Sequence, residues 1–197
     1  MGLNEVMGPD NEIELMLMFS KGDENAFRTL YLAYRKKIIT YCYRFFFDQE
    51  LAEELSQEIF LKVYKAGSRY KPTARFSTWI FKIATHTCLN ELRREKYRTR
   101  IDSIDSEDDM AGREIKDESD NAHESIEAME RKKRISQALR SLPGNQRAAL
   151  LLREYHGFSY KEIGDQLNAT ESGVKSLIHR GRENLRNELH DEFGEDS

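Results

Sequence analysis

The stretch SYKEIGDQLNATESGVKSLIHRGRENLR, residues 159–186, is the part of the sequence that determines the predicted fold. Ser159 and Glu162 have the spacing of a capping box, which predicts that a helix begins there. Asn168 follows that helix, and asparagine tolerates the left-handed backbone conformation that a tight turn often requires. Thr170 is then the expected N-cap of a second helix. The stretch is therefore predicted to form two helices joined by a short turn.

The two predicted helices have apolar inner faces and a basic outer face. The inner faces are formed by Ile163, Gly164, Leu167, Val174, Leu177, Ile178 and Leu185. Side chains on the outer face can contact phosphates or base edges in the major groove of DNA. They are Thr170, Ser172, Lys175, Ser176, His179, Arg180 and Arg182. A solvated helix face is the alternative, but the combination of cap, small residue, turn and basic helix favours a DNA-binding helix-turn-helix.

Length and composition place this motif in an all-α protein. The chain has 197 residues, of which 34% are charged and 39% hydrophobic, and it contains only 3 prolines. This length suits two small domains, and the abundance of leucine, glutamate, lysine and arginine favours helices. The formal net charge of -4 argues weakly against nucleic-acid binding, but the charges are segregated along the chain.

Apolar residues recur at helical spacing from Ile13 to Leu92 and predict a first helical lobe. Asp23 is expected to cap its second helix, and a third helix is expected over 48–65. The fourth helix is predicted to begin near Ser77. It is expected to end in a basic stretch, Arg93, Arg94, Lys96, Arg98 and Arg100.

An acidic segment separates this lobe from the helix-turn-helix. Residues 101–124 are dominated by Asp, Glu, Ser and Asn, and they cannot bury enough apolar surface to offset their ordering entropy. Helical periodicity resumes at Ile126, and Pro143 is expected at the first position of a further helix. Two small helical domains joined by a flexible acidic linker are therefore predicted. The first domain is expected over 12–97, the linker over 98–124 and the helix-turn-helix domain over 125–190. Residues 1–11 and 191–197 are expected to be N-terminal and C-terminal tails.

The sequence lacks the patterns of an enzyme, a metal site or a membrane protein. Cys42 and Cys88 have no CxxC spacing and no histidine partner, and they are expected to be small buried residues. We find no nucleophile–base arrangement, phosphate-binding glycine loop or metal cluster, so no catalytic residue, metal or cofactor is expected. No apolar run approaches the ~20 residues that span a bilayer, and no signal peptide is recognisable. The expectation is a soluble, cytoplasmic protein.

Three motifs together resemble the extracytoplasmic-function sigma factors, which belong to the sigma-70 family of RNA polymerase subunits. The similar segments are AEELSQEIFLK at 52–62, FSTWIFKIA at 76–84 ending in NELRR at 90–94, and GVKS at 173–176 followed by His179 and Arg180. They occur in the family's order, and the resemblance covers the chain from about Glu12 to Leu189. It implies a non-enzymatic factor that binds core polymerase, recognises −35 and −10 promoter elements and melts DNA at the −10 element.

The resemblance also implies binding surfaces for the polymerase. The helix at 52–62 is implied to dock on a coiled coil of the largest polymerase subunit through Glu54, Gln57, Glu58, Phe60 and Lys62. A polar rim around the apolar anchor Phe60 supports this interpretation; an ordinary amphipathic helix is the alternative. Further implied partners are the polymerase flap, promoter DNA and an anti-sigma factor. The acidic linker is implied to enter the polymerase cleft, and a solubilising tether remains equally possible.

The fourth helix and the loop before it are implied to bind the melted −10 strand. Aromatic side chains stack on unpaired bases while Arg and Lys hold the backbone. The residues are Tyr70, Arg75, Phe76, Ser77, Trp79, Lys82, His86, Asn90, Arg93 and Arg94. Core packing is the alternative for at least one of Phe76 and Trp79, and His86 stands where the family is expected to have asparagine.

Two residues of the predicted recognition helix also depart from the family pattern. Leu177 stands where an arginine is frequent, and Gly173 replaces a common threonine. An interior glycine costs roughly 1 kcal/mol relative to alanine, so the promoter preference is left open. Two other functions are also left open: a helix-turn-helix regulator that binds duplex DNA without joining polymerase, and a module that binds a regulatory protein.

Overall fold

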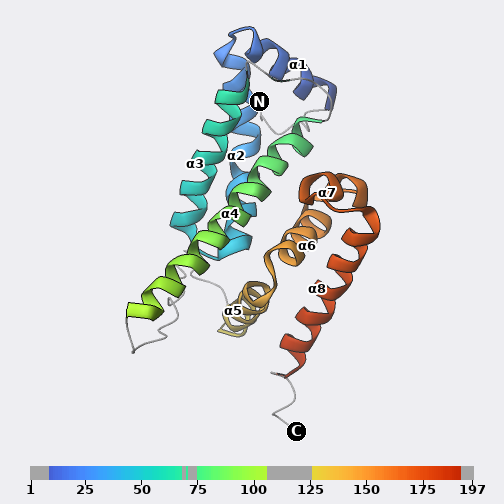
Figure 1. Ribbon diagram of the computed structural model, residues 1–197. Coiled ribbons are helices and arrows are strands. Elements are labelled where there is room, and N and C mark those ends of the chain that lie inside the picture. Colours follow the sequence, from blue (N-terminus) through green and yellow to red (C-terminus); the bar gives the residue numbers. More distant parts are fainter. Residues whose placement is uncertain (1–8, 68–69, 71–74, 106–125, 192–197) are drawn as a thin grey trace.

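The computed structural model describes residues 9–67, 70, 75–105 and 126–191, and within these ranges it contains eight helices and no strand. The helices are α1 Pro9–Ser20, α2 Glu24–Phe46, α3 Gln49–Ala66, α4 Phe76–Asp105, α5 Ile126–Ser141, α6 Gly144–His156, α7 Tyr160–Leu167 and α8 Glu171–Asp191. The all-α prediction is confirmed. Helices α1–α4 form an N-terminal lobe and α5–α8 a C-terminal lobe (Figure 1).

The N-terminal lobe is a bundle in which α2, α3 and α4 surround an apolar core. Asp23 caps α2 as predicted, and its Oδ1 accepts from the backbone N–H of Asn25 at 2.9 Å. Asp48 caps α3 in the same way. Cys42 of α2 and Cys88 of α4 are both fully buried, as expected, and their sulfur atoms lie 3.8 Å apart.

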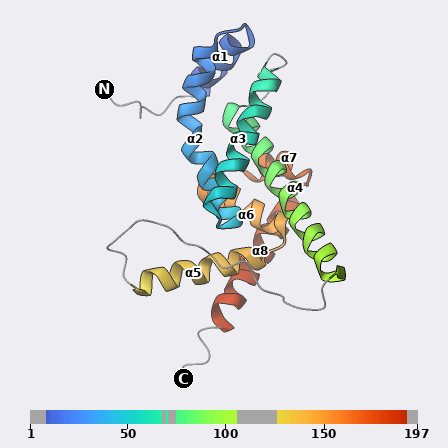
Figure 2. The ribbon, with the colours of Figure 1, turned by 90° about the vertical axis from the view of Figure 1, so that its left-hand side faces the viewer.

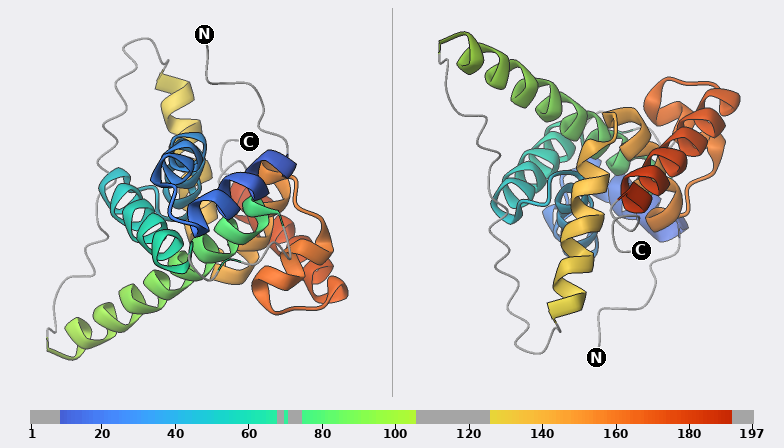
Figure 3. Two further views of the ribbon diagram at one scale, coloured as in Figure 1. Left: turned by 90° about the horizontal axis from the view of Figure 1, so that it is seen from above. Right: turned by 90° about the horizontal axis from the view of Figure 1, so that it is seen from below.

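Helix α4 extends further than the sequence pattern predicted. It begins at Phe76, one residue before the expected cap Ser77, and it continues to Asp105. The prediction of a linker was therefore wrong for residues 98–105; the remaining predicted linker residues lie outside the described part of the chain. A charged stretch does not by itself end a helix, and no Gly or Pro occurs between Phe76 and Asp105. Figure 3 shows this end of α4 projecting beyond the other helices.

In the C-terminal lobe, α6 and α8 pack together and α5 and α7 lie against α8. Pro143 is the N-cap of α6 and not its first residue, because its ψ of 137° is extended rather than helical. Gly157 ends α6 in the left-handed conformation, with a φ of 66°. The lobe is therefore built from short helices that are closely delimited by caps.

The two lobes pack against each other at the C-terminal end of α2, which lies beside α5 and α6 (Figure 2). The last carbonyl groups of a helix have no partner within that helix. Arg140 of α5 donates from Nε to the carbonyl oxygen of Phe46 at 2.8 Å. Arg147 of α6 donates from Nη1 to the carbonyl oxygen of Phe45. Two arginines of the C-terminal lobe therefore cap a helix of the N-terminal lobe.

A second part of the lobe interface joins α4 to the end of α6 and to α7. The ring of His156 lies 4.2 Å from the ring of Phe81 and 5.5 Å from that of Tyr41, measured between centroids. Nearer the start of α4, the hydroxyl of Thr78 donates to Glu162 Oε1 at 3.2 Å. The predicted lobes are thus in direct contact and are not only tethered.

His156 should make stability depend on pH. Burial, followed by the charges of Arg44 and Lys37, lowers its pKa to about 4. An unfolded histidine has a pKa of about 6.5 and binds the proton more tightly, so the free energy of unfolding falls as pH drops from 6.5 towards 4. Between pH 7 and about pH 5 this residue should remove about 2 kcal/mol of stability, as measured by urea unfolding.

The variant His156→Phe is the matched control, because it keeps an aromatic ring and cannot titrate. Its free energy of unfolding should lack this part of the pH dependence. Identical pH dependence in the two proteins would show that the pKa of His156 is not lowered.

Candidate nucleic-acid interface

The turn between α7 and α8 has the cap geometry that the sequence predicted. Ser159 and Glu162 form a reciprocal capping box, with the Ser159 N–H donating to Glu162 Oε2 at 2.9 Å. Asn168 is left-handed, with a φ of 52°. Thr170 Oγ1 accepts from the backbone N–H of Gly173 at 3.1 Å and so caps α8. These contacts fix the angle at which α8 leaves the turn.

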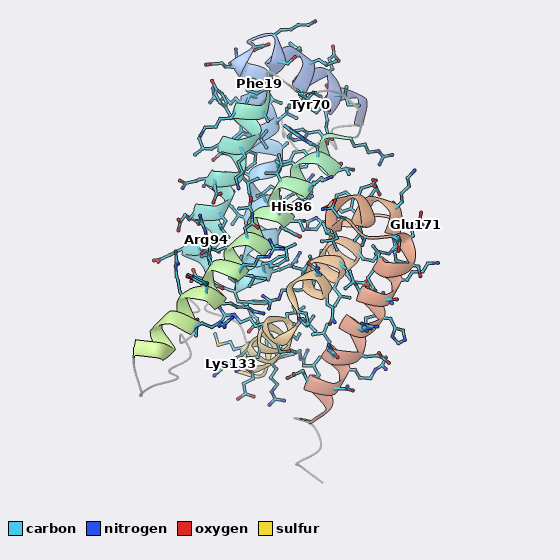
Figure 4. All side chains as sticks on the ribbon, viewed as in Figure 1. Phe19, Tyr70, His86, Arg94, Lys133 and Glu171 are labelled. Atoms are coloured by element: carbon cyan, nitrogen blue, oxygen red, sulfur yellow. The ribbon has the colours of Figure 1, made fainter. Side chains whose placement is uncertain are left out.

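Helix α8 buries one face and exposes the other to solvent. Val174 and Ile178 are 0% and 3% exposed and pack in the core of the C-terminal lobe. All seven residues that were predicted to contact duplex DNA are exposed: Thr170, Ser172, Lys175, Ser176, His179, Arg180 and Arg182. The lobe interface therefore leaves the predicted recognition face uncovered (Figure 4).

The exposed face of α8 differs from the predicted set at its C-terminal end. Arg182 binds Glu154 of α6 and so lies at the edge of this face. Arg186 was not predicted, yet it is exposed and lies seven residues after His179. A spacing of seven returns to the same face of a helix, so helical periodicity alone would have identified it.

Four of the residues predicted to bind the melted strand share one polar face of α4. Lys82, His86, Asn90 and Arg93 follow at intervals of four, four and three residues, which brings them to one side of the helix. Lys82 and His86 are half-buried, whereas Asn90, Arg93 and Arg94 are exposed. Arg93 Nη1 donates to Asn90 Oδ1 at 2.9 Å, so these two side chains present a joined polar surface.

Aromatic residues gather at the start of α4. Trp79 is half-buried, with its ring 5.2 Å from that of Tyr70. Phe76 is fully buried and packs edge-on against Tyr34 at 5.1 Å. Phe76 is therefore a core residue and cannot stack on a base in this arrangement. Ser77 is half-buried and Arg75 is exposed; residues 71–74 of the expected loop lie outside the described part of the chain.

The predicted polymerase surface on α3 needs one correction. Phe60 is only 5% exposed and packs against Tyr31 at 4.8 Å, so it is not a surface anchor. Its neighbour Leu61 is 58% exposed, and it follows Gln57 by one helical turn. Phe60 and Leu61 are adjacent and both apolar, so the sequence pattern does not show which of them faces outward.

The polar residues of this surface lie around Leu61. Glu54, Gln57 and Lys62 are exposed, and Glu58 is half-buried. Lys62 Nζ pairs with Glu58 at 2.7 Å and donates to Thr87 of α4 at 2.9 Å. Lys62 thus connects the α3 surface to the middle of α4.

A further apolar groove, which the sequence did not predict, lies between α5, α6 and α8. It encloses about 280 Å³, and its lining includes Ile135, Leu139, Leu151 and Leu185. Ile135 and Tyr155 are 42% and 50% exposed at its edge. Exposed apolar residues along a groove form a surface on which the apolar side chains of another protein can pack.

The described residues hold neither a metal-binding cluster nor a membrane span. No group of three or more His, Cys, Asp or Glu side chains among them could bind a metal ion. None of the described helices is both long enough and apolar enough to cross a bilayer.

Two family models and several relatives match this chain. Residues 30–98 match the family model of sigma-70 region 2, and residues 132–185 match that of sigma-70 region 4. The ECF RNA polymerase sigma factor SigW of Bacillus subtilis is 32% identical over 178 residues, covering 87% of this chain and 92% of that protein. The ECF RNA polymerase sigma-E factor of Escherichia coli is 30% identical over 172 residues, covering 86% and 89%.

A solved structure supports the fold independently. The sigma factor RpoE, crystallised with the anti-sigma factor NepR from Bartonella quintana, superimposes with a TM-score of 0.64. The match covers 83% of this chain and 96% of that chain at 19% identity. At this identity the likeness concerns the arrangement of the helices alone.

The variant Gly164→Ala tests the turn geometry. A Cβ at this position would lie 2.5 Å from the carbonyl oxygen of Ala169, a backbone atom of the turn. The turn must shift, so we expect the free energy of unfolding to fall by about 1–3 kcal/mol in chemical denaturation. Gly173→Ala is the control. Its Cβ would lie 3.3 Å from the Thr170 hydroxyl and 3.7 Å from the Ala169 Cβ, both side-chain atoms, and its stability should stay within about 1 kcal/mol of wild type. An unchanged free energy of unfolding in Gly164→Ala would contradict the tight turn.

Proposed function

Since this chain belongs to the extracytoplasmic-function sigma factors of the sigma-70 family, we propose how its separate surfaces serve that activity. A sigma factor directs RNA polymerase to promoters, and this one is an initiation factor rather than an enzyme. The observation that carries the proposal is the presence, on one chain, of an exposed basic recognition helix, α8, and a separate polar and aromatic face on α4.

In this proposal the face of α8 binds the −35 element as duplex DNA. Lys175, Arg180 and Arg186 hold phosphates, while Ser172, Ser176 and His179 lie where base edges would be contacted. His179 Nδ1 lies 3.0 Å from Glu183, which orients the imidazole on the exposed face. The capped turn before α8 sets the entry angle into the major groove.

The face of α4 binds the melted −10 strand. Trp79 and Tyr70 offer aromatic surface at one end, and Lys82 with Arg93 offers positive charge beside it. His86 and Asn90 lie one turn apart and are positioned to contact base edges. Unstacking a base costs a few kcal/mol, so capture by these side chains stabilises the open strand without a chemical step.

Core polymerase binds two other surfaces. On α3, exposed Leu61 replaces Phe60 as the apolar anchor within the rim of Glu54 and Gln57. The groove between α5, α6 and α8 suits an apolar helix of a partner protein, and we assign it to the polymerase flap. By the same family relationship we propose a cytoplasmic location and an anti-sigma partner.

Promoter binding requires the two lobes to separate. A compact chain of this length has a radius of gyration of about 16 Å, hence a diameter of about 40 Å. The −35 and −10 elements lie about 25 base pairs apart, which is about 85 Å at ~3.4 Å per base pair. The chain between α4 and α5, residues 106–125, can extend to about 70 Å. Opening at the lobe interface therefore brings both elements within reach.

A helix-turn-helix regulator that acts without polymerase is not favoured, because it leaves α3 and α4 without a role. Run-off transcription with core polymerase on genomic DNA distinguishes the two functions. Discrete new start sites that depend on this protein are expected. DNA binding without any dependent start site would support the regulator.

Substitutions on separate surfaces should separate the two activities. Lys175→Ala with Arg180→Ala removes two cations from α8 and should weaken duplex binding at least tenfold, at about 1 kcal/mol or more per phosphate contact. It should leave core polymerase binding unchanged in a co-elution assay. Leu61→Asp should weaken core polymerase binding and leave duplex binding unchanged. Leu32→Asp is its matched control, because Leu32 is 56% exposed on α2. Equal loss of both activities in either variant would mean that the surfaces are misplaced.

Fixing the lobe interface should block initiation. The variant Thr78→Cys with Glu162→Cys places two thiols where the side chains now meet at 3.2 Å, and a short reducible thiol reagent would join them. Transcription should be lost on cross-linking and regained on reduction. Cys42 and Cys88 are fully buried and should not react; the Glu162→Cys single variant controls for the lost helix cap. Full activity of the cross-linked protein would refute lobe separation.

A further inference from the structure

The N-terminal helix α1 carries a buried carboxylate to which the surfaces described above give no role. We propose that Glu12 of α1 is a positioning residue for binding of the melted −10 strand. It holds Tyr34, and through Tyr34 the first turn of α4, in the arrangement that presents Trp79 to unpaired bases. This inference rests on the proposed function, because it concerns how the DNA-binding face of α4 is held in place.

Glu12 is buried although it is an acid on a short helix near the surface. It is 6% exposed, whereas Glu14 on the same helix is exposed. A buried carboxylate loses its hydration, and that loss is large unless hydrogen bonds or charges compensate for it. The hydroxyl of Tyr34 on α2 donates to Glu12 Oε1 at 2.5 Å. A hydrogen bond to an ionised group is about twice as strong as a neutral one, so this contact fixes both side chains.

Tyr34 passes this constraint to the start of α4. Its hydroxyl also hydrogen-bonds with the side chain of Ser77, and its ring packs edge-on against Phe76. Phe76 and Ser77 are the first two residues of α4. Trp79 follows within the same turn, with its ring centroid 6.0 Å from that of Phe76. One buried hydroxyl therefore joins α1 and α2 to the turn that carries Trp79.

The charge of Glu12 also suits its place beside α4. Helix α1 lies against α4, near the N-terminal end of α4 (Figure 1). A negative charge near the N-terminus of a helix is stabilising, yet α4 has no acidic residue in its own first turn. Glu12 and Ser77 both contact the Tyr34 hydroxyl, so α1 brings a carboxylate close to that turn.

The second ring of the aromatic surface is also close to Glu12. Burial, followed by the charge of Glu12, raises the pKa of Tyr70. The ring of Tyr70 lies 5.2 Å from that of Trp79. Glu12 therefore lies beneath the pair of rings that we assign to the melted strand, and its loss should disturb both of them.

The fluorescence of Trp79 tests the position of this surface directly, because Trp79 is the only tryptophan of the chain. In the free full-length protein, Glu12→Ala should shift the emission maximum and increase quenching by acrylamide. Glu12→Gln keeps an oxygen that accepts from Tyr34, so its emission should match wild type. Glu14→Gln is the matched control, since it removes an exposed acid from the same helix. Circular dichroism verifies that each variant is folded.

Affinities of the holoenzyme separate positioning from general stability. The probes are the single-stranded −10 element and the duplex −35 element of a promoter mapped by run-off transcription. Glu12→Ala should weaken binding of the −10 strand about tenfold, through loss of a hydrogen bond to a charged group, and leave −35 affinity unchanged. Glu12→Gln should stay within about threefold of wild type on both probes.

The variant Tyr34→Phe tests the same contact from the other side and carries the test if Glu12→Ala does not fold. It removes the hydroxyl and keeps the ring against Phe76, and it should weaken −10 binding as Glu12→Ala does. The double variant should lose no more than either single variant, because both remove one shared hydrogen bond. Losses that multiply would show that the two residues act separately and would overturn the proposal.

Two further results would overturn it. Unchanged emission and −10 affinity in Glu12→Ala would show that Glu12 positions nothing on α4. Equal losses on the −10 and −35 probes would make Glu12 a residue of the general fold. Failure of the wild-type holoenzyme to prefer the −10 strand over a scrambled strand would instead refute the proposed function, and with it this role.

Discussion

The arrangement of the whole protein depends on how the C-terminal end of α2 is capped. Arg140 and Arg147 reach from the other lobe to the carbonyl oxygens of Phe46 and Phe45, where the helix dipole also favours positive charge. Arg147 additionally binds the carbonyl oxygen of Leu142 at 3.2 Å and so fixes the turn between α5 and α6. Burial, with the charge of Arg140, lowers the pKa of Arg147 to about 10. This contact sets α6, and through it α7 and α8, against α4.

Helix α4 then serves three purposes on three faces. Ile80 and Ala84 point into the core of the N-terminal lobe and are fully buried. Phe81 faces His156 across the lobe interface. Lys82 and His86 begin the polar face that we assign to nucleic acid. Because each face repeats every three or four residues, consecutive residues on α4 belong to different interactions, and no single amphipathic stripe is recognisable in its sequence.

The local features of this fold could be predicted from sequence, and the long-range ones could not. Asp23, the capping box at Ser159 and the left-handed Asn168 act within a few residues of themselves, so their spacing reveals them. The roles of Arg147 and His156 depend on groups about a hundred residues away, and in a helical pattern both resemble surface residues. The same limit explains why the sequence did not show which of Phe60 and Leu61 is buried. Helical spacing tells which residues share a face of α3, but the position of the neighbouring helix determines which face is buried.

The lobe interface has the properties of a contact that can open. Within the described part of the chain, three buried polar atoms at this interface have no hydrogen-bond partner. They are Arg147 Nε, His156 Nε2 and Gln166 Nε2. Each such atom costs about 1–3 kcal/mol when buried, and water would satisfy all three once the lobes separate. The bond from Thr85 to Gln166 is also long, at 3.5 Å. Opening therefore loses the arginine caps and the aromatic contacts of His156 but recovers these desolvation penalties. That balance is what a factor needs if it is to be compact when free and extended on a promoter.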